Sequence, residues 1–370
     1  MLSSIPWLLS FILPFLVVLT VIVFVHEMGH YLVARWNGIA IQTFSIGFGP
    51  ELFGFNDRHG TRWRLSLIPL GGYVRFVGDM NATSMPDDDA IAAAGPELAP
   101  RLFVNKNVWQ RISVVVAGPA ANVIFTFLVL YALLLGYGRY TIPPVIGDVV
   151  ADGVAAHAGL LKGDIILSVD GYPVRGFEDF QRLVSTSPQR SITVVLERQG
   201  ADQTIVLTPE ATESADQFGT MHRIGRIGVS REVSQTDVTL YRPNAVEALG
   251  MTVEEIHFIV DRTSAFLGDF FVGRGDVKEL GGPVKVAKVS GEVATLGIAA
   301  LINLMALLSL NIGLFNLLPV PMLDGGHLLY FLIEAARRRP LSPKVQEMGF
   351  RFGLALVFTL MIFTLYNDIF

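Results

Sequence analysis

Cysteine is absent from this 370-residue chain. Its absence excludes disulfides, thiolate metal sites and a cysteine nucleophile, so any metal has to be held by His, Asp or Glu. Charge is also scarce, because charged residues make up 16% of the chain and the net charge is -5. This balance argues against a nucleic-acid partner. Hydrophobic residues make up 51% of the chain, which is high for a soluble protein of this length.

Four segments are nearly free of charge and apolar enough to cross a bilayer, which takes about 20 helical residues each. They lie at roughly 7–32, 112–137, 297–320 and 353–366. The first segment lacks a basic start and a small-residue cleavage site, so we interpret it as a membrane helix and not as a signal peptide. The sequence therefore predicts an α-helical polytopic membrane protein with about four transmembrane helices.

Lys and Arg are concentrated between the first and second segments and between the third and fourth. Basic loops stay on the cytoplasmic side of a membrane. Four spans place both basic loops on the same side, so the assignment is self-consistent. We expect both termini, and the long segment at about 139–296, on the opposite side.

The long outer segment contains a candidate small domain at 144–230. Short alternating runs are broken there by Gly and Asp, and an amphipathic stretch, GFEDFQRLV, precedes two β-prone runs. This order predicts an α+β domain, and AGLLKGDIILSVDGYPV resembles a PDZ domain, with Lys162 where that family usually has proline. A generic small β-rich domain is the alternative interpretation.

The domain that follows, 231–296, is predicted to be an amphipathic helical connector lying along the membrane. Its Glu254, Glu255 and His257 could suggest a metal site, but the solvated face of a helix explains them better. The remaining parts are an N-terminal membrane region, 1–138, and a C-terminal membrane region, 297–370, each with two spans.

The first basic segment has two apolar, β-prone runs, FSIGFGPELFGF and TRWRLSLIPLGGYVRF, on either side of the turn NDRHG. This pattern predicts a membrane-associated β-hairpin. Open strand edges are not tolerated in lipid, so the edges of this hairpin have to be covered or to line a cavity.

Ionisable residues follow directly on the first apolar segment, which has no charge from Met1 to Val25. His26, Glu27 and His30 form an HExxH motif, whose two histidines share one face of a helix. Both imidazoles can then reach one Zn²⁺, with Glu27 close to the water that zinc would activate. The alternative, a pair of structural histidines, leaves three ionisable groups beside an apolar run unexplained.

A catalytic zinc needs a third protein ligand. Asp324, in NLLPVPMLDGGH, is the best candidate, and His327 is a weaker alternative. Pro319 and Pro321 cannot continue a regular helix, so we expect the third span to break at about 316–318. Asp324 could instead, or in addition, act as the N-cap of the following helix.

The HEMGH and NLLPVPMLDG segments together resemble the two signatures of site-2 proteases, which are zinc metalloproteases that cut within membranes. The resemblance extends to FSIGFGP, IPLGGYV, AGPAANVIF, GGPVKVAK and LDGGHLLYF, and so covers most of the chain. The bacterial regulator-of-sigma-E proteases are the most similar group. Members of that group often have two tandem PDZ domains, whereas this chain has room for one.

The resemblance implies specific roles for individual residues. It implies zinc on His26, His30 and Asp324, with Glu27 as general base. It also implies that Asn316 holds the substrate backbone, for which bonding to a neighbouring helix is the alternative. The hairpin resembles a re-entrant loop whose edge pairs with an unwound substrate, and the candidate edge residues are Gly71, Gly72 and Tyr73.

The resemblance further implies the setting in which the protein acts. We expect a multi-pass protein of the bacterial inner membrane, with a periplasmic PDZ-like domain and periplasmic termini. Its partners would be the lipid bilayer and single-span membrane proteins such as anti-sigma factors, which it would cleave in regulated intramembrane proteolysis. The PDZ-like domain would act as a size filter or bind a peptide. The alternative function is a non-catalytic membrane adaptor that uses this domain.

Overall fold

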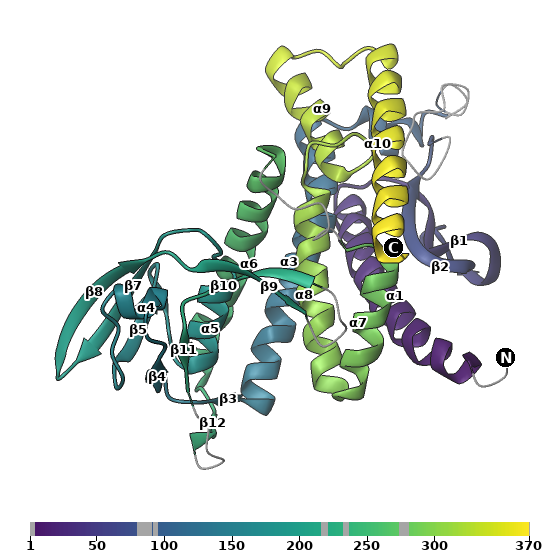
Figure 1. Cartoon of the computed structure of the whole chain (residues 1–370). Helices are drawn as coiled ribbons and strands as arrows, with labels where there is room; N and C mark the ends of the chain where they lie inside the picture. The colour runs from purple at the N-terminus through teal and green to yellow at the C-terminus, as the bar shows by residue number, and fades with distance from the viewer. Residues whose placement is uncertain are drawn as a thin grey trace. The chain divides into compact units, whose positions relative to one another are not determined.

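A computed structural model describes residues 4–79, 91, 95–215, 221–231, 237–273 and 281–369. The chain forms two compact units, whose elements are labelled in Figure 1. The first unit comprises Met1–Leu130 and Asp276–Phe370, and the second comprises Tyr131–Gly275. Each unit is described separately below.

The first unit is mainly helical. Its α-helices are α1 (Ser4–Trp36), α3 (Val108–Tyr137, whose last turns belong to the second unit), α7 (Pro283–Thr295), α8 (Ile298–Asn316), α9 (Asp324–Arg337) and α10 (Pro343–Ile369). Two short 3₁₀ helices, η1 (Ala99–Arg101) and η2 (Phe103–Asn105), precede α3.

Four helices in the described part of the chain are long and apolar enough to cross a membrane. They are Ser10–Trp36, Val108–Tyr137, Ile298–Asn316 and Lys344–Asp368. The prediction of four helices that are able to span a membrane is confirmed. The third of these helices ends at Asn316, where the sequence predicted a break.

Close contact between α1 and α3 depends on small residues. A Cβ atom added to Gly29 would lie 2.2 Å from the Ala117 carbonyl oxygen, so glycine is required at this crossing. Further along α1, Val18 and Ile22 are buried against Met305 of α8. The helix that carries HExxH is therefore fixed by α3 and by α8.

Strands β1 (Ile41–Asn56) and β2 (Arg62–Phe76) form the expected β-structure, but not as a simple hairpin. Thr43 of β1 pairs with Arg75 and also with Arg62, so the first part of β1 lies between two stretches of β2. The stretch of β2 at 72–76 is thus an outer strand. The alternation of side chains along the sequence predicts the two strands. The return of β2 along β1 depends instead on the register in which the strands pair.

The β1–β2 sheet has one buried and one exposed region. Phe44 and Val74 are buried in a cluster with Tyr31 of α1 and Phe103 of η2. The distal part instead exposes large apolar side chains, namely Phe48, Leu52, Phe53, Phe55, Leu65, Leu67 and Ile68. Such a patch is too apolar for contact with water alone, which supports membrane association of this part.

The second unit contains a four-stranded antiparallel sheet with the order β6-β5-β7-β8. Its strands are β3 (Arg139–Thr141), β4 (Asp148–Val149), β5 (Ile165–Val169), β6 (Tyr172–Pro173), β7 (Ile192–Arg198), β8 (Ala201–Leu207), β9 (Glu210–Ala215), β10 (Met221–Arg226), β11 (Val229–Ser230) and β12 (Thr239–Tyr241). The helices of this unit are α4 (Val154–His157), α5 (Phe177–Ser185) and α6 (Ala245–Phe271). The α+β composition expected for 144–230 is observed.

Helix α6 packs on this small domain. Its Phe258 joins the buried cluster of the α+β fold, and its Glu255 lies 2.5 Å from Arg182 of α5. Glu254 likewise pairs with Arg175 at 2.6 Å. The two glutamate side chains remain 40% and 30% exposed, so this face of α6 is partly solvated, and arginines distant in sequence pair with it. Helix α7 lies in the same predicted connector, but it belongs to the first unit. The predicted domain boundaries stay predictions.

Candidate metal centre

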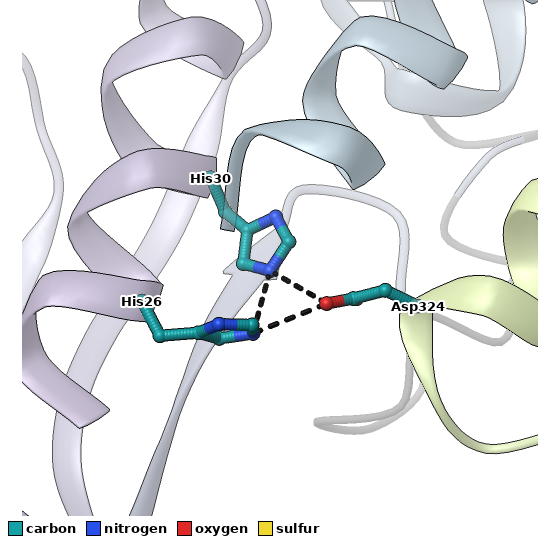
Figure 2. Close-up of side chains that lie close together, drawn as sticks. All are labelled: His26, His30 and Asp324. Carbon is teal, nitrogen blue, oxygen red and sulfur yellow. Dashed lines mark hydrogen bonds and ion pairs between the residues drawn. The ribbon is translucent and has the colours of Figure 1, made fainter. Parts of the chain in front are cut away.

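His26 and His30 lie one turn apart on α1 and point toward the same place (Figure 2). Their Nε2 atoms are 3.2 Å apart, and their rings meet edge to face. Each side chain is only 12% exposed. The four-residue spacing on a helix thus produces the convergence that the sequence predicted.

Asp324 approaches both histidines from the first turn of α9 (Figure 2). Its Oδ2 atom lies 3.1 Å from His26 Nε2 and 3.5 Å from His30 Nε2. This oxygen is buried, and no contact to it has the geometry of a hydrogen bond. A buried carboxylate oxygen without a hydrogen bond costs free energy unless a cation compensates it.

These three side chains form a group whose candidate ligand atoms all lie within 4.8 Å of one another. Two imidazole nitrogens and one carboxylate oxygen are a donor set typical of catalytic zinc, and they leave a coordination position open. The Asp324 oxygen lies buried between two imidazoles without a hydrogen bond, and this observation makes the residues fit a metal ion.

The turn that presents Asp324 depends on the glycines that follow it. A Cβ on Gly325 would lie 2.2 Å from the Leu318 carbonyl oxygen, and one on Gly326 would lie 2.5 Å from the Val320 carbonyl oxygen. The chain therefore folds back tightly between α8 and α9. Leu323, and not Asp324, occupies the N-cap position of α9, so the capping role considered for Asp324 is not observed.

The Glu27 side chain extends from α1 toward the β1–β2 sheet. The backbone N–H of Val74 lies near its carboxylate. A Cβ on Gly72 would lie 3.3 Å from Glu27 Cγ and 2.8 Å from a methyl group of Val23, so β2 runs directly against this part of α1. The sheet thus reaches the glutamate of the HExxH motif.

The other sequence candidates do not join the group of ligands. His327 is absent from the three-residue group found among the described residues. Gly71 and Tyr73 flank Gly72 on the outer stretch of β2, and Gly71 has a φ of +127°, which favours glycine. Asn316 is the last residue of α8, and none of the described residues forms a hydrogen bond with its side chain.

Sequence reasoning missed the residues that contact the outer nitrogens of the two histidines. His30 Nδ1 lies 2.8 Å from the Val114 carbonyl oxygen, and His26 Nδ1 lies 3.2 Å from the Asn122 side-chain amide, both in α3. The segment AGPAANVIF contributed to the resemblance, but no pattern in it indicated which side chain would face α1.

The donor set and its setting define a class of protein. Two histidines four apart on an apolar helix, a glutamate between them and an aspartate from another helix are the arrangement of a metallopeptidase. The model of Peptidase family M50 matches residues 14–360, and the chain belongs to this family. It is a zinc metalloprotease.

Individual relatives agree over nearly the full length. A protein of Mesorhizobium japonicum, named as a zinc metalloprotease, is 49% identical over 365 residues, which cover 98% of this chain and 99% of the relative. Metalloprotease MmpA of Caulobacter vibrioides is 36% identical over 383 residues, which cover 98% of this chain and 96% of the relative. The solved PDZ domain of the SdrC-like protein from Listeria monocytogenes matches 23% of this chain and 83% of its own length, with 20% identity and a TM-score of 0.18.

Proposed function

We propose that this metalloprotease is an intramembrane endopeptidase, with its zinc ion on His26, His30 and Asp324 and with Glu27 as general base. The observation that carries the proposal is the convergence of these three side chains from two helices of a bundle with four candidate membrane spans. A non-catalytic adaptor would not need a buried carboxylate oxygen that lies between two imidazoles without a hydrogen bond.

The chemistry follows from the positions of these groups. Zinc, when bound, supplies Lewis acidity that polarises a peptide carbonyl and makes water acidic. The Glu27 carboxylate takes a proton from the attacking water and then delivers it to the leaving amine nitrogen. This carboxylate lies next to the backbone of β2 at Val74 and Gly72.

A transmembrane substrate has to unwind before it can be cut, because helical hydrogen bonds occupy its peptide carbonyls. The outer strand of the β1–β2 sheet, with Gly71, Gly72 and Tyr73, can replace those bonds by pairing with the unwound segment. Support comes from the short distance between Gly72 and Glu27. Asn316 has an amide that can hold the substrate backbone in addition to the outer strand of the β1–β2 sheet.

The proposed substrates are single-span membrane proteins, such as anti-sigma factors, cleaved in regulated intramembrane proteolysis. The proposed location is the inner membrane of a bacterium, with both termini and the second unit in the periplasm. In that arrangement the PDZ-like domain cannot supply catalytic groups. It acts as a filter against substrates with bulky periplasmic domains, and capture of a peptide is the competing role.

Cleavage within a transmembrane segment is the test of this proposal. The purified wild-type protein and Glu27→Gln would be placed in vesicles with a set of single-span membrane proteins, and the products would be mapped by mass spectrometry. We expect cuts inside the spans with the wild type and none with Glu27→Gln. Cuts confined to water-exposed segments would overturn the intramembrane assignment.

Photo-crosslinking tests the role of the β2 edge without disturbing its two constrained glycines. A photoreactive phenylalanine analogue at Tyr73, in the Glu27→Gln background, should crosslink to the transmembrane segment of a substrate. The same analogue at Phe53, in the exposed distal part of the sheet, is the matched control. Equal crosslinking at both positions would mean that the substrate merely contacts the sheet as lipid does.

A further inference from the structure

Three residues of α3, spaced four apart on one face, lie against the two histidines of α1. The middle one is Gly118, where a Cβ would lie 2.3 Å from His30 Nε2 and 2.9 Å from His26 Cε1. Glycine therefore allows α3 to approach the imidazoles. Val114 and Asn122, one turn to either side, each reach the outer nitrogen of one histidine.

The contact of His30 has only one chemical interpretation. A backbone carbonyl oxygen can only accept a hydrogen bond, so His30 Nδ1 carries the proton and donates it to Val114 at 2.8 Å. In the neutral imidazole the lone pair then lies on His30 Nε2, which is 3.5 Å from Asp324 Oδ2. An imidazole that binds a metal through one nitrogen typically donates its other N–H in this way.

His26 requires the same arrangement, and the Asn122 amide is the group in reach of its Nδ1, at 3.2 Å. In the structure the amide nitrogen of Asn122 faces His26, and the amide oxygen is buried without a hydrogen-bond partner. The nitrogen and oxygen of an amide are interchangeable in shape. Rotating the amide places the oxygen at His26 Nδ1, where it can accept the proton.

We propose that Asn122 is a positioning residue of the metal centre. Its side-chain oxygen accepts the Nδ1–H of His26 and so fixes both the tautomer and the ring orientation that leave Nε2 for the metal. The inference rests on the proposed zinc site, and it assigns to α3 the orientation of both histidine ligands: the Val114 carbonyl for His30 and the Asn122 amide for His26.

Asn122 is held firmly enough for this role. The residue is fully buried, and its backbone carbonyl accepts hydrogen bonds from Thr126 Oγ1 at 2.9 Å and from Ser309 Oγ of α8 at 3.4 Å. A Cβ on Gly313 of α8 would lie 3.1 Å from Asn122 Cβ, so the two helices are in close contact at this point. Asn122 therefore lies within a tightly packed contact between α3 and α8.

The test compares zinc affinity among three variants of the full-length protein, freed of metal and titrated against a chelator. Loss of such an outer hydrogen bond typically weakens metal binding by about 10–100-fold, which is the effect expected for Asn122→Leu. Asn122→Asp keeps an acceptor oxygen and should bind zinc within about threefold of the wild type, since the new charge faces a cationic centre. Ile124→Ala, at an exposed position of the same helix, should bind zinc like the wild type.

The His26→Ala variant separates the two possible failures. If His26→Ala binds zinc like the wild type, His26 is no ligand and the proposed centre fails together with the role of Asn122. If His26→Ala loses zinc while Asn122→Leu binds normally, the centre stands and only the positioning role is overturned. A merely structural Asn122 would be harmed more by Asp than by Leu, because Asp buries a charge between apolar helices. The absorption spectrum of bound Co²⁺ gives a second readout, which Asn122→Leu should change and Asn122→Asp should preserve.

Discussion

Asp57, in the turn between β1 and β2, fastens the sheet to the helix of the metal centre. Its carboxylate accepts hydrogen bonds from the Tyr31 hydroxyl at 2.8 Å and from Trp63 Nε1 at 3.1 Å, as well as from the backbone N–H groups of His59 and Thr61. Tyr31 directly follows His30 on α1. Stability of this turn is therefore coupled to the position of the ligands.

These contacts give a prediction for pH. Burial acts to raise the pKa of Asp57, but the hydrogen bonds outweigh it and lower the pKa to about 2. Because an unfolded Asp has a pKa of about 3.9, the stabilisation is full above that pH and is lost as pH falls toward about 2. Thermal unfolding should show wild type more stable than Asp57→Asn at pH 7, with a difference that shrinks between about pH 4 and pH 2. A constant difference over that range would contradict the prediction.

Single residues were predictable where their role follows from spacing or from chemistry alone. His26, Glu27 and His30 form a motif whose geometry is set by any regular helix. Asp324 could be inferred because a cysteine-free chain leaves few ligand types. Asn122 could not, because its role depends on which face of α3 meets α1, and that depends on packing at Gly118.

Helix α10 supports the loop that carries Asp324. A Cβ on Gly353 would lie 1.9 Å from the Pro321 carbonyl oxygen, and one on Gly349 would lie equally close to the Tyr330 hydroxyl. The two glycines, four apart on α10, therefore make room for the turn between α8 and α9. A transmembrane helix that exposes most of its surface thus has one face that fits the ligand loop.

Gly353→Leu should displace this loop and weaken zinc binding by about tenfold or more, since ligand geometry sets affinity. Ala355→Leu is the control, because Ala355 lies on the exposed side of the same helix. Zinc affinity measured by competition with a chelator distinguishes the two variants. Equal affinity in both would show that the loop holds its position without α10.

Elements were predictable as far as hydropathy and alternation define them. The four spans follow from composition, and the break after α8 follows from Pro319 and Pro321. The return of β2 along β1 and the packing of α6 on the second unit were not predictable. Both depend on pairs that are distant in sequence, such as Thr43 with Arg75 and Arg182 with Glu255.

The sequence predicts the orientation of the whole molecule in the membrane, and this orientation can be measured directly. The cysteine-free chain allows single-cysteine labelling without a background signal. Asp202→Cys, in exposed β8, should react with an impermeant maleimide in intact spheroplasts, whereas Arg339→Cys, after α9, should react only after permeabilisation. The reverse pattern would place the basic loops outside and would invert the proposed topology.

The central claim is that His26, His30 and Asp324 together hold one catalytic zinc ion while Glu27 acts on the proton. Zinc content per chain, measured by mass spectrometry on purified protein, tests this claim most directly. We expect about one zinc in wild type and in Glu27→Gln, and a strong loss in Asp324→Ala, because a catalytic site needs its three protein ligands. Undiminished zinc in Asp324→Ala, or loss of zinc in a folded Glu27→Gln protein, would contradict it.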